Sequence, residues 1–150
     1  MTPDSLFSLA GALALPGWLL LILAPRHWRV SRLLPLLVIP GLLGLLYAAL
    51  ILRHFGVAEG GFGTLADVRR LFGNDWLLLA GWVHYLAFDL VAGAVAAARM
   101  DRVAIGRIVQ APILVCIFLF GPLGFVLALL VELALRPVAS LRPAAPTERT

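Results

Sequence analysis

Three ionisable side chains lie inside apolar stretches of this sequence, and their types suit them to acid–base chemistry. His84 and Asp89 interrupt the run GWVHYLAFDL at residues 81–90, and Glu132 interrupts a second apolar run closer to the C-terminus. A charged side chain such as aspartate costs about 2.5–3.5 kcal/mol at the centre of a bilayer on insertion scales. Such a group therefore needs a partner, a polar cavity or a catalytic role, and Asp89 lies at the most costly depth.

Helical phase separates the two polar residues of this run. At 3.6 residues per turn, His84 and Asp89 project about 140° apart around the helix axis. By contrast, Trp82, Tyr85 and Asp89 share one face, where the tyrosine hydroxyl can hydrogen-bond to the carboxyl group. This face predicts a carboxyl group beside an aromatic wall for an apolar ligand. A purely structural role stays open for each polar residue, as a hydrogen bond between helices or a pair with an arginine.

Glu132 has two candidate partners. If the last two apolar segments form an antiparallel hairpin, Glu132 lies closer to His84 than to Asp89; alternatively it pairs with Arg136, one helical turn further on. The spacing of histidines and carboxylates matches no metal-ligand pattern, so we predict no metal. We also predict no cofactor, because the chain has no lysine for a Schiff base and no histidine pair for haem.

The elements that must position these residues are membrane helices. Of the 150 residues 62% are hydrophobic and only 13% are charged, with a mean hydropathy of +1.01, whereas a soluble domain has about 25% charged residues. Four continuous apolar stretches approach the roughly 20 residues that a spanning helix needs. The sequence predicts an all-α, integral membrane four-helix bundle made of two helical hairpins. The expected spans are residues 6–24, 33–52, 77–98 and 113–135.

Shorter features complete this domain, which we place at residues 1–136. Thr64 is a candidate N-cap for a short amphipathic helix at 65–72, lying in the membrane interface or packed as an ordinary loop helix. The proline-rich residues 137–150 are expected to be disordered. A weak internal duplication is an open hypothesis, because Gly-Trp recurs in the first and third spans and Gly/Pro pairs recur in the second and fourth.

Charge suggests the orientation and the partners. The net charge is +4, but the arginines stand in short loops beside apolar segments, so we expect membrane lipid as a partner and no nucleic acid. Six arginines fall on each predicted face, and the shorter loops, 25–32 and 99–112, are expected to be cytoplasmic. The chain is predicted to be a multi-pass protein of a bacterial inner membrane, and assembly into a homo-oligomer stays an open alternative. Cys116 stands alone, so no disulfide is expected.

Several stretches together resemble a known family. The order PGWLLLILAPR, LLYAALIL, GWVHYLAFDL and FGPLGFVLALL is similar to the abscisic-acid-deficiency type of small membrane protein, which is neoxanthin synthase-like, and the chain is identified as a bacterial-type member. The most specific matches are Gly81, Trp82, His84, Asp89 and Leu90, and then residues 120–124.

This resemblance implies an apolar carotenoid or isoprenoid ligand and an intramolecular isomerisation that opens a 5,6-epoxide to an allene. Such a reaction needs an acid for the epoxide oxygen and a base for a polyene proton, and the candidates are Asp89, His84 and Glu132. The candidate ligand wall comprises Trp82, Tyr85, Trp18, Tyr47, Phe120 and Pro122. Two alternatives stay open: a non-catalytic pigment- or lipid-binding or accessory protein, and a small proton-coupled transporter.

Overall fold

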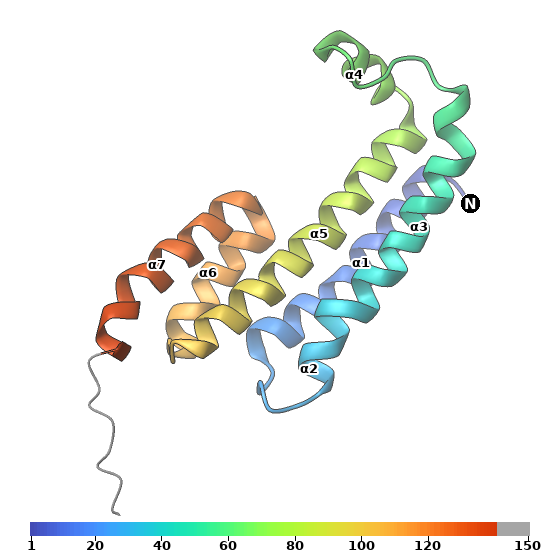
Figure 1. Ribbon diagram of the computed structural model, residues 1–150. Coiled ribbons are helices and arrows are strands. Elements are labelled where there is room, and N and C mark those ends of the chain that lie inside the picture. Colours follow the sequence, from blue (N-terminus) through green and yellow to red (C-terminus); the bar gives the residue numbers. More distant parts are fainter. Residues whose placement is uncertain (141–150) are drawn as a thin grey trace, which may run out of the picture.

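The computed structural model describes the backbone of residues 1–140 and the side chains of residues 1–135, and helices dominate it (Figure 1). In chain order these are α1 (Pro3–Leu23), α2 (Val30–Leu33), the π-helical turn η1 (Leu34–Val38), α3 (Ile39–His54), the 3-10 turn η2 (Phe55–Val57), α4 (Leu65–Leu71), α5 (Asp75–Arg102), α6 (Arg107–Phe120) and α7 (Pro122–Ser140). No strand occurs within residues 1–140. The all-α prediction is therefore confirmed for this part of the chain.

Local sequence signals determine where several helices begin. The Thr2 side chain accepts a hydrogen bond from the Ser5 backbone amide at 3.3 Å at the start of α1. Thr64 likewise caps α4 through the Asp67 amide at 3.1 Å, and Asn74 caps α5 through the Trp76 amide at 3.0 Å. Each cap satisfies an amide that the helix itself leaves unpaired. The short helix expected at residues 65–72 is present as α4.

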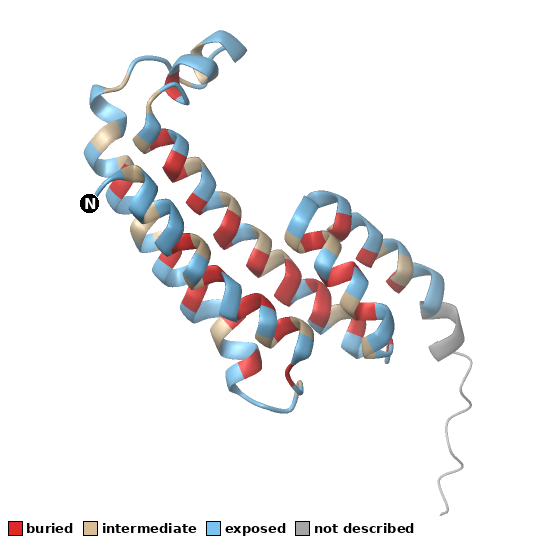
Figure 2. Cartoon of the chain, turned by 180° about the vertical axis from the view of Figure 1, so that it is seen from behind, coloured by how far each residue is buried: buried red, intermediate tan, exposed pale blue. Residues whose placement is uncertain are grey.

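Within residues 1–140, three helical segments are long and apolar enough to cross a membrane: Pro3–Leu23, Val30–Val57 and Asp75–Arg102. They correspond to the expected spans at residues 6–24, 33–52 and 77–98. The third of these, α5, lies at the centre, because α1, α3, α6 and α7 all pack against it, and Figure 2 shows buried residues along much of its length. Gly93 of α5 allows close packing, since a Cβ atom there would lie 2.7 Å from the Trp18 ring of α1.

The expected fourth span at residues 113–135 is wrong. Residues in this stretch form two antiparallel helices, α6 and α7, which meet at Gly121 (Figure 1). Gly121 has a φ of +39°, which a side-chain-bearing residue rarely adopts, and Gly124 lies directly against the backbone of Ile117. The 14 residues of α6 measure only about 21 Å, less than the roughly 30 Å of a hydrocarbon core. The chain is thus three long helices plus a short hairpin, and not a four-helix bundle of two spanning hairpins.

This reversal also contradicts the internal duplication. Gly121-Pro122 marks the turn between two helices, whereas the supposed equivalent, Pro40-Gly41, lies inside the continuous helix α3. Helix α7 continues to Ser140, past residue 136 where the sequence predicts the tail to begin. Residues 141–150 of that predicted tail lie outside the described residues.

A buried polar network fixes the base of the α6–α7 hairpin. Gln110 of α6 is 1% exposed and donates to Asp101 at 2.7 Å, and it accepts from Arg26 at 3.3 Å. Arg107 donates to the Ala24 carbonyl at 3.1 Å, next to the C-terminal end of α1. Burial and the neighbouring Arg107 lower the pKa of Arg26, while Asp101 acts in the opposite direction. These contacts join α1, α5 and α6 and so determine where the hairpin turn lies along α5.

Candidate functional site

Asp89 lies near the midpoint of α5, and one oxygen atom of its carboxyl group is buried without a hydrogen bond. Its Oδ2 atom is buried and has no hydrogen-bond partner among the described residues. The ion pairs within residues 1–135 also leave Asp89 without a counter-ion. A buried polar atom of this kind costs about 1–3 kcal/mol, which marks Asp89 as a group kept for more than packing.

The turn of the α6–α7 hairpin closes over this carboxyl group. A Cβ atom on Gly121 would lie 2.5 Å from Asp89 Oδ1 and 2.8 Å from Oδ2. Gly121 ends α6 and directly precedes α7, so the ends of both helices meet beside this carboxyl group. The Tyr85 hydroxyl, one turn before Asp89, donates to the Leu119 carbonyl at 3.3 Å. The hairpin turn therefore contacts both polar residues of this α5 face.

An aromatic row continues from Tyr85 towards α1, as helical phase predicts. Trp82 stacks on Tyr85 with ring centroids 5.2 Å apart, and Phe7 of α1 lies 5.3 Å from Trp82. Trp82 also lines a pocket of about 400 Å³ between the first turns of α1 and α5. The face that carries Trp82, Tyr85 and Asp89 is thus a continuous apolar wall with the carboxyl group at one end.

His84 lies on a different side of α5. Its ring is 5.5 Å from Tyr47 of α3 and stacks on Phe88 at 4.5 Å. Tyr47 and His84 line one pocket, whereas the α6–α7 turn lies against Asp89. The structure therefore does not bring His84 and Asp89 into one site, and an acid–base pair of these two residues is not formed.

Glu132 is paired at the far end of the hairpin. Its side chain is 6% exposed and accepts a hydrogen bond from Arg99 Nε at 2.7 Å. The expected proximity to His84 is wrong, because it assumed that residues 113–135 cross as one helix. The alternative partner, the Arg136 side chain, lies outside the described side chains. Glu132 thus joins α7 to α5 and is removed from the candidate site.

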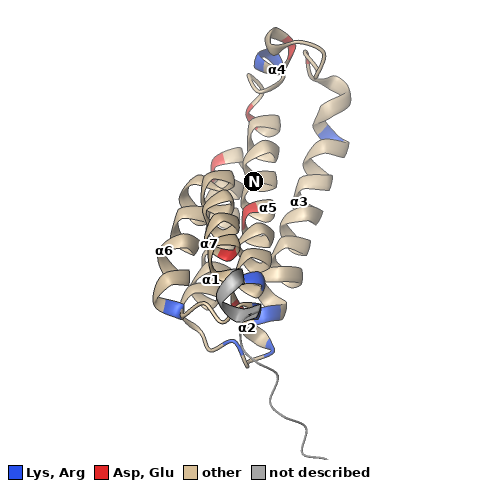
Figure 3. Cartoon of the chain, turned by 60° about the vertical axis from the view of Figure 1, so that its left-hand side comes forward, with Lys and Arg blue, Asp and Glu red and all other residues tan. Residues whose placement is uncertain are grey.

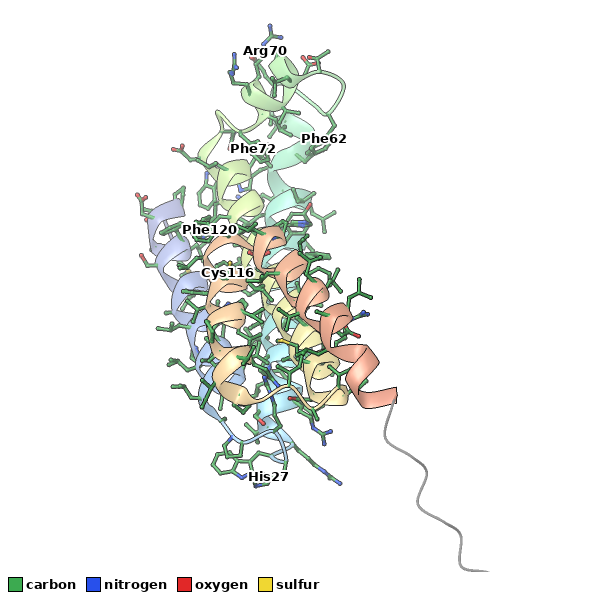
Figure 4. All side chains as sticks on the ribbon, turned by 90° about the vertical axis from the view of Figure 1, so that its left-hand side faces the viewer. His27, Phe62, Arg70, Phe72, Cys116 and Phe120 are labelled. Carbon is green, nitrogen blue, oxygen red and sulfur yellow. The ribbon has the colours of Figure 1, made fainter. Side chains whose placement is uncertain are left out.

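The other predicted wall residues divide into two groups. Trp18 is 2% exposed and packs edge-on against Phe118 at 5.3 Å, so it is a core residue and not a wall that an incoming ligand can contact. Phe120 and Pro122 flank Gly121 at the hairpin turn and are exposed (Figure 4 labels Phe120). Within the described residues, no group of three His, Cys, Asp or Glu side chains lies together as metal ligands would.

Sequence reasoning missed the structural role of Gly121. The available signal was a Gly-Pro pair in the middle of an apolar stretch, because proline favours the first turn of a new helix. Hydropathy alone does not indicate a turn at this pair, since the residues on both sides of it are equally apolar.

Replacing Gly121 with alanine should destabilise the hairpin turn and displace Asp89. The positive φ costs about 1–2 kcal/mol for a residue with a side chain, and the added methyl group would overlap the Asp89 carboxyl group. We expect the free energy of unfolding in detergent to fall by about this amount. Gly44→Ala is the matched control, because Gly44 lies inside α3 with no atom near its Cβ position. Equal stability of the two variants would contradict the assigned role of the turn.

Comparison with known proteins identifies one matching family. A family model described as ABA DEFICIENT 4-like matches residues 5–127. No match was found among curated proteins or among solved structures. The matched range includes Trp82, Tyr85, Asp89 and the hairpin turn at Gly121.

Proposed function

Because the chain belongs to the ABA DEFICIENT 4-like family, we propose that it is a membrane enzyme that isomerises an epoxide of a carotenoid or related isoprenoid lipid. The sequence resemblance to neoxanthin synthase-like proteins supports this reaction class, and three candidate membrane spans support access to a lipid-soluble substrate. The observation that carries the proposal is the half-buried Asp89 carboxyl group, which lies against the turn at Gly121 and whose Oδ2 atom has no hydrogen-bond partner among the described residues.

One carboxyl group suffices for the proton transfers. Protonated Asp89 donates its proton to the epoxide oxygen as the carbon–oxygen bond breaks, and the resulting carboxylate removes a proton from the neighbouring polyene carbon. The electrons of that carbon–hydrogen bond form the new double bond of the allene. The substrate gains a hydroxyl group, loses no atoms overall and undergoes no net oxidation, and Asp89 returns to its protonated form.

The surrounding residues have supporting roles in this proposal. Trp82 and Phe7 provide apolar surface along which a polyene can lie, and Phe120 adds an exposed ring at the hairpin turn. Tyr85 is held against the hairpin by its hydrogen bond to the Leu119 carbonyl, close to the reacting carboxyl group. His84 and Glu132 take no part, since one lies on another side of α5 and the other is paired with Arg99.

The proposal is tested with the purified protein in lipid nanodiscs that contain a xanthophyll 5,6-epoxide. We expect a product of unchanged mass, with one new hydroxyl group and an allene, identified by chromatography and mass spectrometry without added oxidant. Recovery of unchanged epoxide bound in stoichiometric amount would contradict the enzyme and favour the pigment-binding alternative.

The hairpin reversal also sharpens the proposed orientation in the membrane. The prediction of six arginines on each side rests on a fourth crossing at residues 113–135, which the turn at Gly121 contradicts. Of the described arginines, six now lie at the α2 end and three at the α4 end (Figure 3). This excess supports the proposal that the loops 25–32 and 99–112 face the cytoplasm, in what we propose to be a multi-pass protein of a bacterial inner membrane.

Orientation is measured by labelling single cysteines with a membrane-impermeant maleimide, in a Cys116→Ser background. We expect Glu59→Cys to react in intact spheroplasts and Trp28→Cys to react only in inverted vesicles. The reverse pattern would show that the arginine-rich end faces outwards.

A further inference from the structure

A second pocket lies between α3, α4 and the first turns of α5, away from Asp89. Its volume is about 290 Å³, close to the lower limit of about 300 Å³ for small-molecule sites. The pocket is lined by Tyr47 of α3, by Ala80 and His84 of α5, and by three phenylalanines, Phe55, Phe62 and Phe72. Figure 4 shows Phe62 and Phe72 at the α4 end of the molecule, away from Phe120 at the hairpin turn. This size suits one ring and not a whole polyene.

Two polar groups at this pocket have no protein partner. Within the described residues, neither the His84 imidazole nor the Tyr47 hydroxyl forms a hydrogen bond, and their rings lie 5.5 Å apart. Both residues belong to candidate membrane spans, where an unsatisfied polar group is costly. The neutral imidazole offers one donor and one acceptor, and the phenol offers both as well. Together they match a single hydroxyl group, which can donate to one and accept from the other.

We propose that this pocket binds an apolar ring that carries one hydroxyl group, as a site separate from Asp89. The ring packs against Phe55, Phe62 and Phe72, while its hydroxyl group bonds to His84 and Tyr47. Helix α4 forms one side of the pocket, since Leu71 also lines it and is 3% exposed. The site does not depend on the epoxide chemistry, because its residues do not contact the carboxyl group of Asp89.

The experiment compares menthol with p-menthane, which has the same ring without the hydroxyl group. The full-length protein in nanodiscs carries ¹⁵N-labelled histidine rings, and the other two histidines, His27 and His54, serve as internal references. We expect menthol to shift the His84 ring resonance in a saturable way, and p-menthane to produce no such shift. Tyr47→Phe keeps the ring but removes one hydrogen bond, so the dissociation constant for menthol should rise about twofold to tenfold.

Two further variants separate this site from the proposed enzyme. Asp89→Asn should leave the menthol response unchanged, whatever its effect on epoxide turnover. Menthol is expected to raise the Tm of the wild-type protein more than p-menthane does, and His84→Phe should abolish this difference. If His84→Phe does not fold, the menthol titration of Tyr47→Phe still tests whether the hydroxyl group is bound in this pocket. Equal responses to menthol and p-menthane would overturn the proposal, because they would show a pocket for lipid tails without recognition of the hydroxyl group. The absence of a menthol-induced shift at His84 would also overturn it, and so would loss of that shift in Asp89→Asn.

Discussion

Replacing Asp89 with asparagine is expected to lower epoxide turnover by about 10²–10⁴-fold, the usual contribution of a general acid or base. The asparagine side chain has nearly the same shape, so it fits beneath Gly121, but it can neither donate the carboxyl proton nor accept one from the substrate. The protein should still fold and insert, because the described residues provide no ion pair to Asp89 that the change would break. The initial rate of product formation in nanodiscs measures the effect.

Glu59→Gln is the matched control for this prediction. Glu59 is exposed in the segment before α4 and lies far along the chain from the hairpin turn, so the same loss of one negative charge should leave turnover unchanged. Wild-type turnover by the Asp89→Asn variant would eliminate the proposed mechanism. Proton flux through liposomes that required Asp89, without any epoxide conversion, would instead favour the transporter alternative.

Replacing Arg99 with methionine is expected to destabilise the fold by about 3 kcal/mol. Removing one member of a buried ion pair costs about 3–5 kcal/mol when it leaves the other charge uncompensated, and less when that charge keeps a further partner. The lower value applies here, since the Arg99 side chain is 37% exposed whereas that of Glu132 is 6% exposed. The free energy of unfolding, from reversible denaturation in mixed micelles, measures the change.

Two matched variants define the contribution of this pair. Arg102→Met removes an exposed arginine from the same helix end and should change stability little. The double variant Arg99→Met with Glu132→Leu replaces both charges with apolar groups and should recover most of the lost stability. A single variant as stable as Arg102→Met would mean that the pair does not hold α7 against α5.

Much of the helical structure could be predicted from local sequence. Each of the three candidate membrane spans combines an apolar stretch of sufficient length with capping or turn residues, and these properties depend only on neighbours in the chain. The shared face of Trp82, Tyr85 and Asp89 followed from the 3.6-residue helical period, and so did the separation of His84 from Asp89. The family could likewise be recognised from the residues of the third and fourth apolar stretches.

The partners of the ionisable residues could not be predicted in the same way. A continuous fourth helix would bring Glu132 near His84, whereas the turn at Gly121 brings it to Arg99. Tyr47, whose ring lies against His84, comes from α3, and residues of the α4 segment help to line the same pocket, so both lie elsewhere in the chain. Such pairings depend on which helices pack together, and apolar residues of similar size allow several packings with nearly the same hydropathy.

The sequence by itself thus determined that the chain is helical, which segments are apolar enough to span a membrane, and which residues share a face of α5. Only the tertiary structure decided that residues 113–135 reverse direction, and that this reversal encloses Asp89. The physical reason is that hydropathy records the free energy of burial, which is the same for a crossing helix and for two short helices packed on α5. The direction of the chain after α6 depends instead on one left-handed backbone angle at Gly121, on the contact of Gly124 with Ile117, and on the polar contacts of Gln110 at the base of α6.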